Sequence, residues 1–119
     1  MKYLLLIYDR EADWETISEA DQGKIFQEYG QYTSDIKKSG HHLAGEALQP
    51  ISTATTVRVK NGKTLTTDGP FAETREQLGG FYMVEAKDLD EAIALAAGIP
   101  AVRTGSIEVR PIMPTPLPD

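Results

Sequence analysis

The chain has 119 residues, 40% of them hydrophobic and 25% charged, which is the size and composition of one globular domain with its own core. Its net charge of −6 repels phosphate backbones and anionic lipids, so nucleic acid and membrane surfaces are not expected partners. The absence of cysteine excludes disulfides, thiolate metal sites and cysteine nucleophiles. With no signal peptide or membrane span recognisable, we expect a cytoplasmic domain with a radius of gyration of about 14 Å.

The first part of the chain predicts a strand, a helix and a second strand. Residues 3–8 are almost wholly apolar, which is typical of a strand covered on both faces. Ser18 is a good N-cap for a helix over residues 19–38 that ends before Gly40. That helix has one continuous apolar stripe, formed by Ile25, Tyr29, Tyr32 and Ile36. Residues 41–48 predict a second, shorter strand.

The middle of the chain predicts a β-hairpin. Residues 55–60 alternate in polarity, Asn61-Gly62 suits a type I′ turn, and residues 63–67 return. A further strand is expected over residues 79–86.

The last part of the chain predicts a helix, a strand and a tail. Asp88 begins a helix in a pattern resembling a capping box, and Gly98 and Pro100 end it. Residues 106–112 alternate as in a final strand. The domain is therefore expected to span residues 1–112, followed by a proline-rich tail at 113–119.

This element order predicts an α+β, ferredoxin-like fold of two split βαβ units with an inserted hairpin. One layer of helices leaves the other sheet face open, and several large apolar side chains were expected there: Tyr3, Tyr8, Phe81, Tyr82 and Met83. We therefore expect a homodimer, formed sheet to sheet, with an enclosed space between the two subunits.

The segment after the hairpin contains the most interesting polar residues. Asp68 and Glu73 flank a rigid Gly-Pro turn that carries Phe71. One carboxylate could stay ionised near turn amides while the other, buried beside the ring, kept its proton, as general acid-base chemistry requires. The alternative interpretation is an ordinary turn with an anchoring aromatic residue and a solvated glutamate.

Other candidate sites are weaker. His41 and His42 are the only histidines. Because neighbouring residues of a strand point to opposite faces, we do not expect them to share a metal ion. His42 alone could act as a base near Glu46. Residues 79–84 have the glycine-aromatic pattern of RNA-recognition domains. The leading basic residue of that pattern and a positively charged surface are both missing, so RNA binding is not expected. Three arginines could hold an anionic ligand or simply pair with surface acids: Arg75, Arg103 and Arg110.

Several stretches together resemble the DGPF branch of the YCII-related domain family over nearly the whole chain. They are residues 1–8, 45–48, 67–74, 77–81 and 105–111. The resemblance implies a ferredoxin-like subunit that pairs into a dimeric α/β barrel in bacteria. It also implies a ligand pocket lined partly by the Asp68–Phe71 turn. No cofactor is expected. Tyr29, His42, Glu46, Phe71 and Phe81 are the expected ligand-binding residues, and Asp68 and Glu73 the expected catalytic ones.

The resemblance leaves the activity open. Better-understood enzymes of the wider family use a His and Asp pair. With an approximate alignment through Gly40, the histidine position falls near Tyr29 and the aspartate position near Lys38. The pair is therefore absent from this chain. One hypothesis is a homodimeric domain that binds a small molecule. A second is a cofactor-independent acid-base enzyme, lyase or dehydrochlorinase-like, acting on a phenol, enol or lactone-like substrate. A third is a regulatory partner of an extracytoplasmic-function sigma factor.

Overall fold

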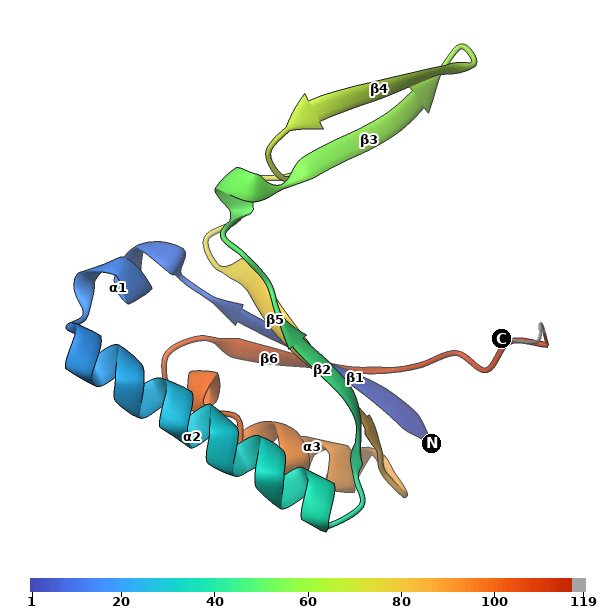
Figure 1. Ribbon diagram of the computed structural model, residues 1–119. Helices are drawn as coiled ribbons and strands as arrows, with labels where there is room; N and C mark the ends of the chain where they lie inside the picture. Colours follow the sequence, from blue (N-terminus) through green and yellow to red (C-terminus); the bar gives the residue numbers. More distant parts are fainter. Residues whose placement is uncertain (117–119) are drawn as a thin grey trace.

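An antiparallel sheet of four strands forms the body of the protein in the computed structural model, which describes residues 1–116 (Figure 1). The spatial order of the strands is β2-β5-β1-β6. Their bounds are β1 (Lys2–Asp9), β2 (His42–Ala47), β5 (Gln77–Glu85) and β6 (Ser106–Pro111). The fold is therefore α+β, as predicted, and its strand order is compatible with the ferredoxin-like arrangement.

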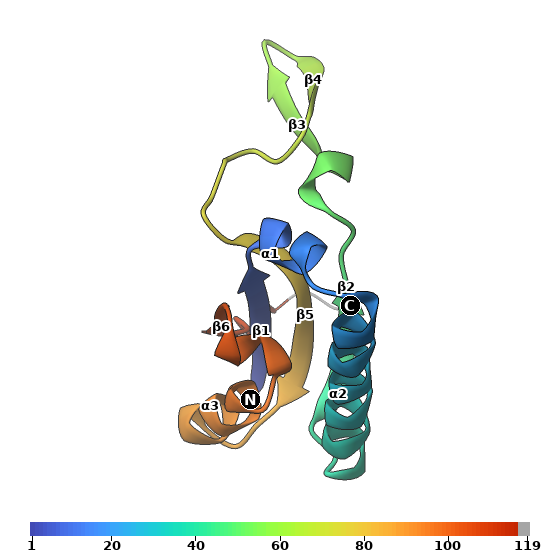
Figure 2. The same cartoon turned by 90° about the vertical axis from the view of Figure 1, so that its left-hand side faces the viewer.

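Helices cover one face of this sheet (Figure 2). The two long ones are α2 (Glu19–Lys38) and α3 (Leu89–Ala97); the short elements are α1 (Glu11–Thr16), η1 (Ile51–Thr53) and η2 (Pro100–Arg103). No helix within residues 1–116 is long and apolar enough to cross a membrane.

The core lies between the sheet and the two long helices. Leu5, Val84 and Ile99 are its largest fully buried side chains. Alternate residues of the central strands face it, because successive side chains of a strand point to opposite sides. The other buried hydrophobic residues are Tyr3, Ile7, Tyr32, Ile36, Tyr82, Ala86, Ala92, Ala96 and Ala101.

Helix α2 has the bounds that its capping residues predict. The Ser18 hydroxyl accepts a hydrogen bond from the backbone N–H of Asp21 at 3.1 Å. At the other end, the N–H of Gly40 donates to Lys37 and that of His41 to Ile36, which is the Schellman arrangement. This turn fixes the direction in which β2 leaves the helix.

The inserted hairpin projects away from the body (Figures 1 and 2). Its strands, β3 (Thr55–Lys60) and β4 (Lys63–Asp68), form a sheet of their own; we call residues 55–68 the arm. Asn61 and Gly62 have φ values of 52° and 76°, which confirms the type I′ turn. The radius of gyration is 16.5 Å, so the expected compact value was wrong, because the arm stands off the core.

Two further expectations need correction. Tyr3 and Tyr82 are buried on the helix-covered face, where the rings of Tyr82 and Tyr32 pack edge to face at 5.2 Å. Strand alternation already separates Tyr3 from Tyr8, so only the latter lies on the open face with Phe81 and Met83. Helix α1 forms where no element was predicted between residues 8 and 18. Contacts such as the edge-to-face pair of Trp14 and Phe26 stabilise this short helix.

Gly105 should be intolerant of a side chain. A Cβ there would lie 2.0 Å from the carbonyl oxygen of Tyr8, so the backbone of β1 or β6 would have to move. We expect Gly105→Ala to lower the free energy of unfolding by about 2 kcal/mol or more. Gly23→Ala is the matched control, since nothing lies within 4 Å of that helical position, and it should stabilise by about 0.5–1 kcal/mol. Urea unfolding followed by Trp14 fluorescence tests both, and equal stabilities would contradict the proposed clash.

Candidate functional site

The sheet face opposite the helices has an apolar centre that no other element within residues 1–116 covers. Leu4 and Leu6 lie there on β1, next to Phe81 and Met83 on β5. All four are partly exposed, whereas their neighbours on the other face are buried. We call this surface the open face. Because contiguous apolar surface exposed to water is unfavourable, it is a candidate contact or binding surface.

A polar cluster adjoins this apolar centre. The Tyr8 hydroxyl donates to the Glu108 carboxylate at 3.4 Å, and Arg110 forms an ion pair with the same carboxylate. Strand pairing places all three on the open face, since Leu6 lies opposite Glu108 and Leu4 opposite Arg110. The mixture of apolar wall and few polar groups is typical of ligand sites. The alternation of residues 106–112 predicted the strand but not this cluster.

A hollow of about 270 Å³ lies at the root of the arm. Its lining is mainly apolar and consists of Leu48, Gln49, Pro50, Ile51, Thr53, Ala54 and Leu78. The N–H of Gly69 donates to the carbonyl of Ala54 at 2.7 Å. The Asp68–Phe71 turn is therefore bonded to one residue of this hollow, although no residue of the turn lines it.

The residues expected to form a site do not meet within one subunit. Asp68, Phe71 and Glu73 are exposed at the root of the arm, with 82% of Phe71 accessible. Glu46 and Phe81 are direct cross-strand partners on the open face. No hydrogen bond or ion pair within residues 1–116 joins these two groups.

Tyr29 and His42 lie on the helix-covered side. The His42 ring packs against Tyr82, with ring centres 6.3 Å apart, and Tyr29 packs against the core from α2. Burial raises the pKa of Tyr29 to about 12, although a backbone hydrogen bond with Ala101 acts in the opposite direction. Its phenol therefore stays protonated at neutral pH. A role for either residue in ligand binding stays a prediction from the sequence.

Two of the three candidate arginines pair with acids of the same chain. The Arg103 guanidinium lies 2.8 Å from the Glu28 carboxylate, and Arg110 pairs with Glu108. In each case the hydrogen bond from the guanidinium to the carboxylate raises the arginine pKa further. Arg75 is exposed in the connection before β5.

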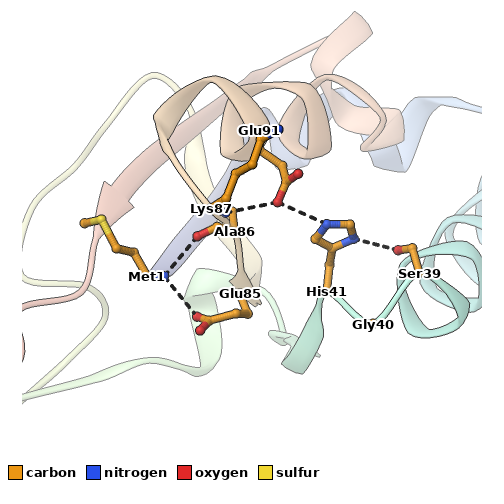
Figure 3. A pocket seen from close by; sticks show the side chains of 8 residues that line it. All are labelled: Met1, Ser39, Gly40, His41, Glu85, Ala86, Lys87 and Glu91. Atoms are coloured by element: carbon orange, nitrogen blue, oxygen red, sulfur yellow. Dashed lines mark hydrogen bonds and ion pairs between the residues drawn. The ribbon is translucent and has the colours of Figure 1, made fainter.

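A second, shallow pocket of about 310 Å³ contains a Ser-His-Glu chain of hydrogen bonds (Figure 3). Ser39 Oγ lies 2.7 Å from His41 Nδ1, and His41 Nε2 lies 3.2 Å from Glu91 Oε1. Glu91 also accepts the backbone N–H of Lys87 at 3.0 Å, which is the main reason that its pKa is lowered, with His41 as a further cause. These hydrogen bonds join the end of α2 to the start of α3.

The order of groups is that of a catalytic triad, but the surrounding backbone does not suit one. Acyl transfer needs free N–H donors to stabilise an oxyanion. The N–H groups of Ser39, Gly40 and His41 all donate to carbonyls of α2, and that of Lys87 donates to Glu91. The Ser39 hydroxyl also lies within hydrogen-bonding distance of the Ile36 carbonyl. We therefore interpret the Ser39-His41-Glu91 chain as a structural link between the two helices.

The fold and the open face define the protein as a small α+β domain with one helix layer and an uncovered sheet face. A family model of the YCII-related domain matches residues 1–116, so the chain belongs to that family. It is also 34% identical over 114 residues to an uncharacterized protein of Rhizobium meliloti (strain 1021), with 94% of this chain and 92% of that protein covered.

The link through Glu91 should make stability depend on pH. The pKa of Glu91 is lowered in the folded state from an unfolded value near 4.5. The stability that its carboxylate contributes is therefore fully present above pH 4.5 and is lost as the pH falls through the folded pKa. Glu91→Gln should therefore be less stable than the wild type at pH 7, and the difference should shrink on acidification. Urea unfolding of both proteins from pH 7 to pH 3 measures it. A difference that stays constant with pH would contradict the assignment.

Proposed function

We propose that the protein is a homodimeric binding domain for a small polar or aromatic molecule, of the DGPF branch of its family. The open face carries the proposal: two copies packed face to face would remove both apolar centres from water. Such pairing of ferredoxin-like subunits would give a dimeric α/β barrel.

The proposed dimer would also complete the site. Glu46, Phe81 and the Tyr8-Glu108 pair would then line a closed space instead of a solvent-exposed surface. Hydrogen bonds and ion pairs are stronger there, because less water competes for them. The hollow at the root of the arm would offer the apolar wall for an aromatic ring.

We place the ligand in that hollow, with Asp68 and Glu73 as polar anchors and Phe71 as an apolar cover. The support is the position of the Asp68–Phe71 turn, whose Gly69 is bonded to Ala54 of the hollow. An apolar hollow with a carboxylate within reach would suit a ligand that has an aromatic body and a hydroxyl group.

The proposed dimer can be tested by introducing a charged side chain on the open face. Wild-type protein should sediment as a dimer at micromolar concentration, and Leu6→Glu should weaken self-association roughly 100-fold or more, because the carboxylate would be buried unpaired. Ile93→Glu is the control, since Ile93 is 49% exposed on α3, on the helix side. A monomeric wild type, or a Leu6→Glu protein that dimerises normally, would refute the proposal.

The ligand site is tested with 4-nitrophenol, whose absorbance reports binding and ionisation. We expect saturable binding that Asp68→Asn weakens roughly 10-fold or more, the usual effect of losing a hydrogen bond to a charged group. Glu15→Gln, which removes an exposed carboxylate of α1, is the matched control and should bind as the wild type does. Equal affinity for all three proteins would remove Asp68 from the site.

A further inference from the structure

Glu11, the first residue of α1, connects the body of the protein to the root of the arm. Its carboxylate accepts a hydrogen bond from the backbone N–H of Ile51 at 3.0 Å, 40 positions along the chain. Ile51 begins η1, through which the chain passes from β2 into the arm (Figure 1). The first N–H groups of a helix have no partner within it, and a carboxylate is a strong acceptor for them. The contact therefore satisfies a main-chain group of η1 and bonds it to α1.

This contact is the polar anchor of a long segment. Within residues 1–116, no other hydrogen bond or ion pair joins residues 49–73 to the rest of the chain. That range includes η1, the arm and the Asp68–Phe71 turn. A hydrogen bond with an ionised partner is about twice as strong as one between neutral groups. The Glu11 carboxylate is therefore well suited to fix the segment to the body.

From Ile51, backbone hydrogen bonds run through the hollow to the turn. The Ile51 carbonyl accepts the N–H of Ala54 at 3.0 Å, and the Ala54 carbonyl accepts the N–H of Gly69 at 2.7 Å. Ile51 and Ala54 both line the hollow, and Gly69 directly follows Asp68. Because each bond joins one residue to the next, a displacement of Ile51 would move the wall of the hollow and the turn together.

The main chain of Glu11 is linked to the other end of the same turn segment. Its N–H donates to Gln77 Oε1 at 2.9 Å, and Gln77 Nε2 donates to the Thr74 carbonyl at 2.7 Å. Thr74 directly follows Glu73, the second expected carboxylate. Residues 69–74 are therefore connected to Glu11 at both ends, through its carboxylate on one side and its N–H on the other.

We propose that Glu11 is a positioning residue of the ligand site, whose carboxylate fixes η1, the hollow and the Asp68–Phe71 turn in the geometry that binds the ligand. The inference rests on the ligand site under Proposed function and does not depend on the dimer. Glu11 itself does not line the hollow, so it acts through Ile51. A site that is ordered in advance binds more tightly, because the ligand does not have to order it.

The experiment measures 4-nitrophenol binding by the full-length wild type and three variants. Glu11→Ala removes the acceptor for the Ile51 N–H. Glu11→Gln keeps an oxygen that can accept it but removes the negative charge from the first turn of α1. Glu15→Ala is the matched control, an exposed glutamate of the same helix. Hydrogen exchange at the amides of Ile51 and Gly69, without ligand, follows the bonds directly, and urea unfolding verifies that each body is folded.

We expect Glu11→Ala to bind 4-nitrophenol roughly 10-fold more weakly and to lose amide protection at Ile51 and Gly69. Glu11→Gln should restore both to within about threefold of the wild type, and Glu15→Ala should match the wild type.

Unchanged affinity or amide protection in Glu11→Ala, with Asp68→Asn still impaired in binding, would overturn the role of Glu11 and leave the ligand site intact. Glu11→Gln as weak as Glu11→Ala would also overturn it, because the charge of α1 and not the bond to Ile51 would then be the cause. A wild type without saturable binding would refute the ligand site and the role of Glu11 with it.

Discussion

A single layer of helices can shield only one face of a sheet, and this constraint governs the rest of the protein. On the shielded face, Tyr3, Leu5 and Val84 are buried against α2 and α3. On the other, residues of the same strands are equally apolar but stay in contact with water. Since burial of apolar surface is the main favourable term in association, the unshielded face is the strongest reason to expect a second chain.

The residues expected to form a site are divided between two parts of the subunit. The open face supplies Glu46, Phe81 and the cluster around Glu108, whereas the carboxylates of Asp68 and Glu73 lie at the root of the arm. This separation is compatible with the proposed site, in which two subunits would each contribute residues.

The sequence predicted features whose causes are local. Ser18 and Gly40 bound a helix because they satisfy its end groups, and Asn61-Gly62 makes a turn because both residues tolerate positive φ. Features with distant causes were missed. No short sequence pattern encodes the packing between elements. That packing decides whether the arm folds back on the body and whether Tyr82 or Phe81 faces the helices.

The candidate site was predictable to a smaller degree. The Asp68–Phe71 turn could be picked out by its residue types, but its bond to Ala54 and the hollow beside it depend on the return of the chain from the arm. Tyr8 and Glu108 are exactly one hundred positions apart in the chain, so only the pairing of β1 with β6 brings them together.

Small-angle X-ray scattering of the wild-type protein across the micromolar range tests the central claim most directly. The account predicts a scattering mass of twice the 13.1 kDa chain, together with a distance distribution that fits two bodies joined at their sheets. A mass of one chain at every concentration, with a radius of gyration close to the 16.5 Å of the single subunit, would contradict it.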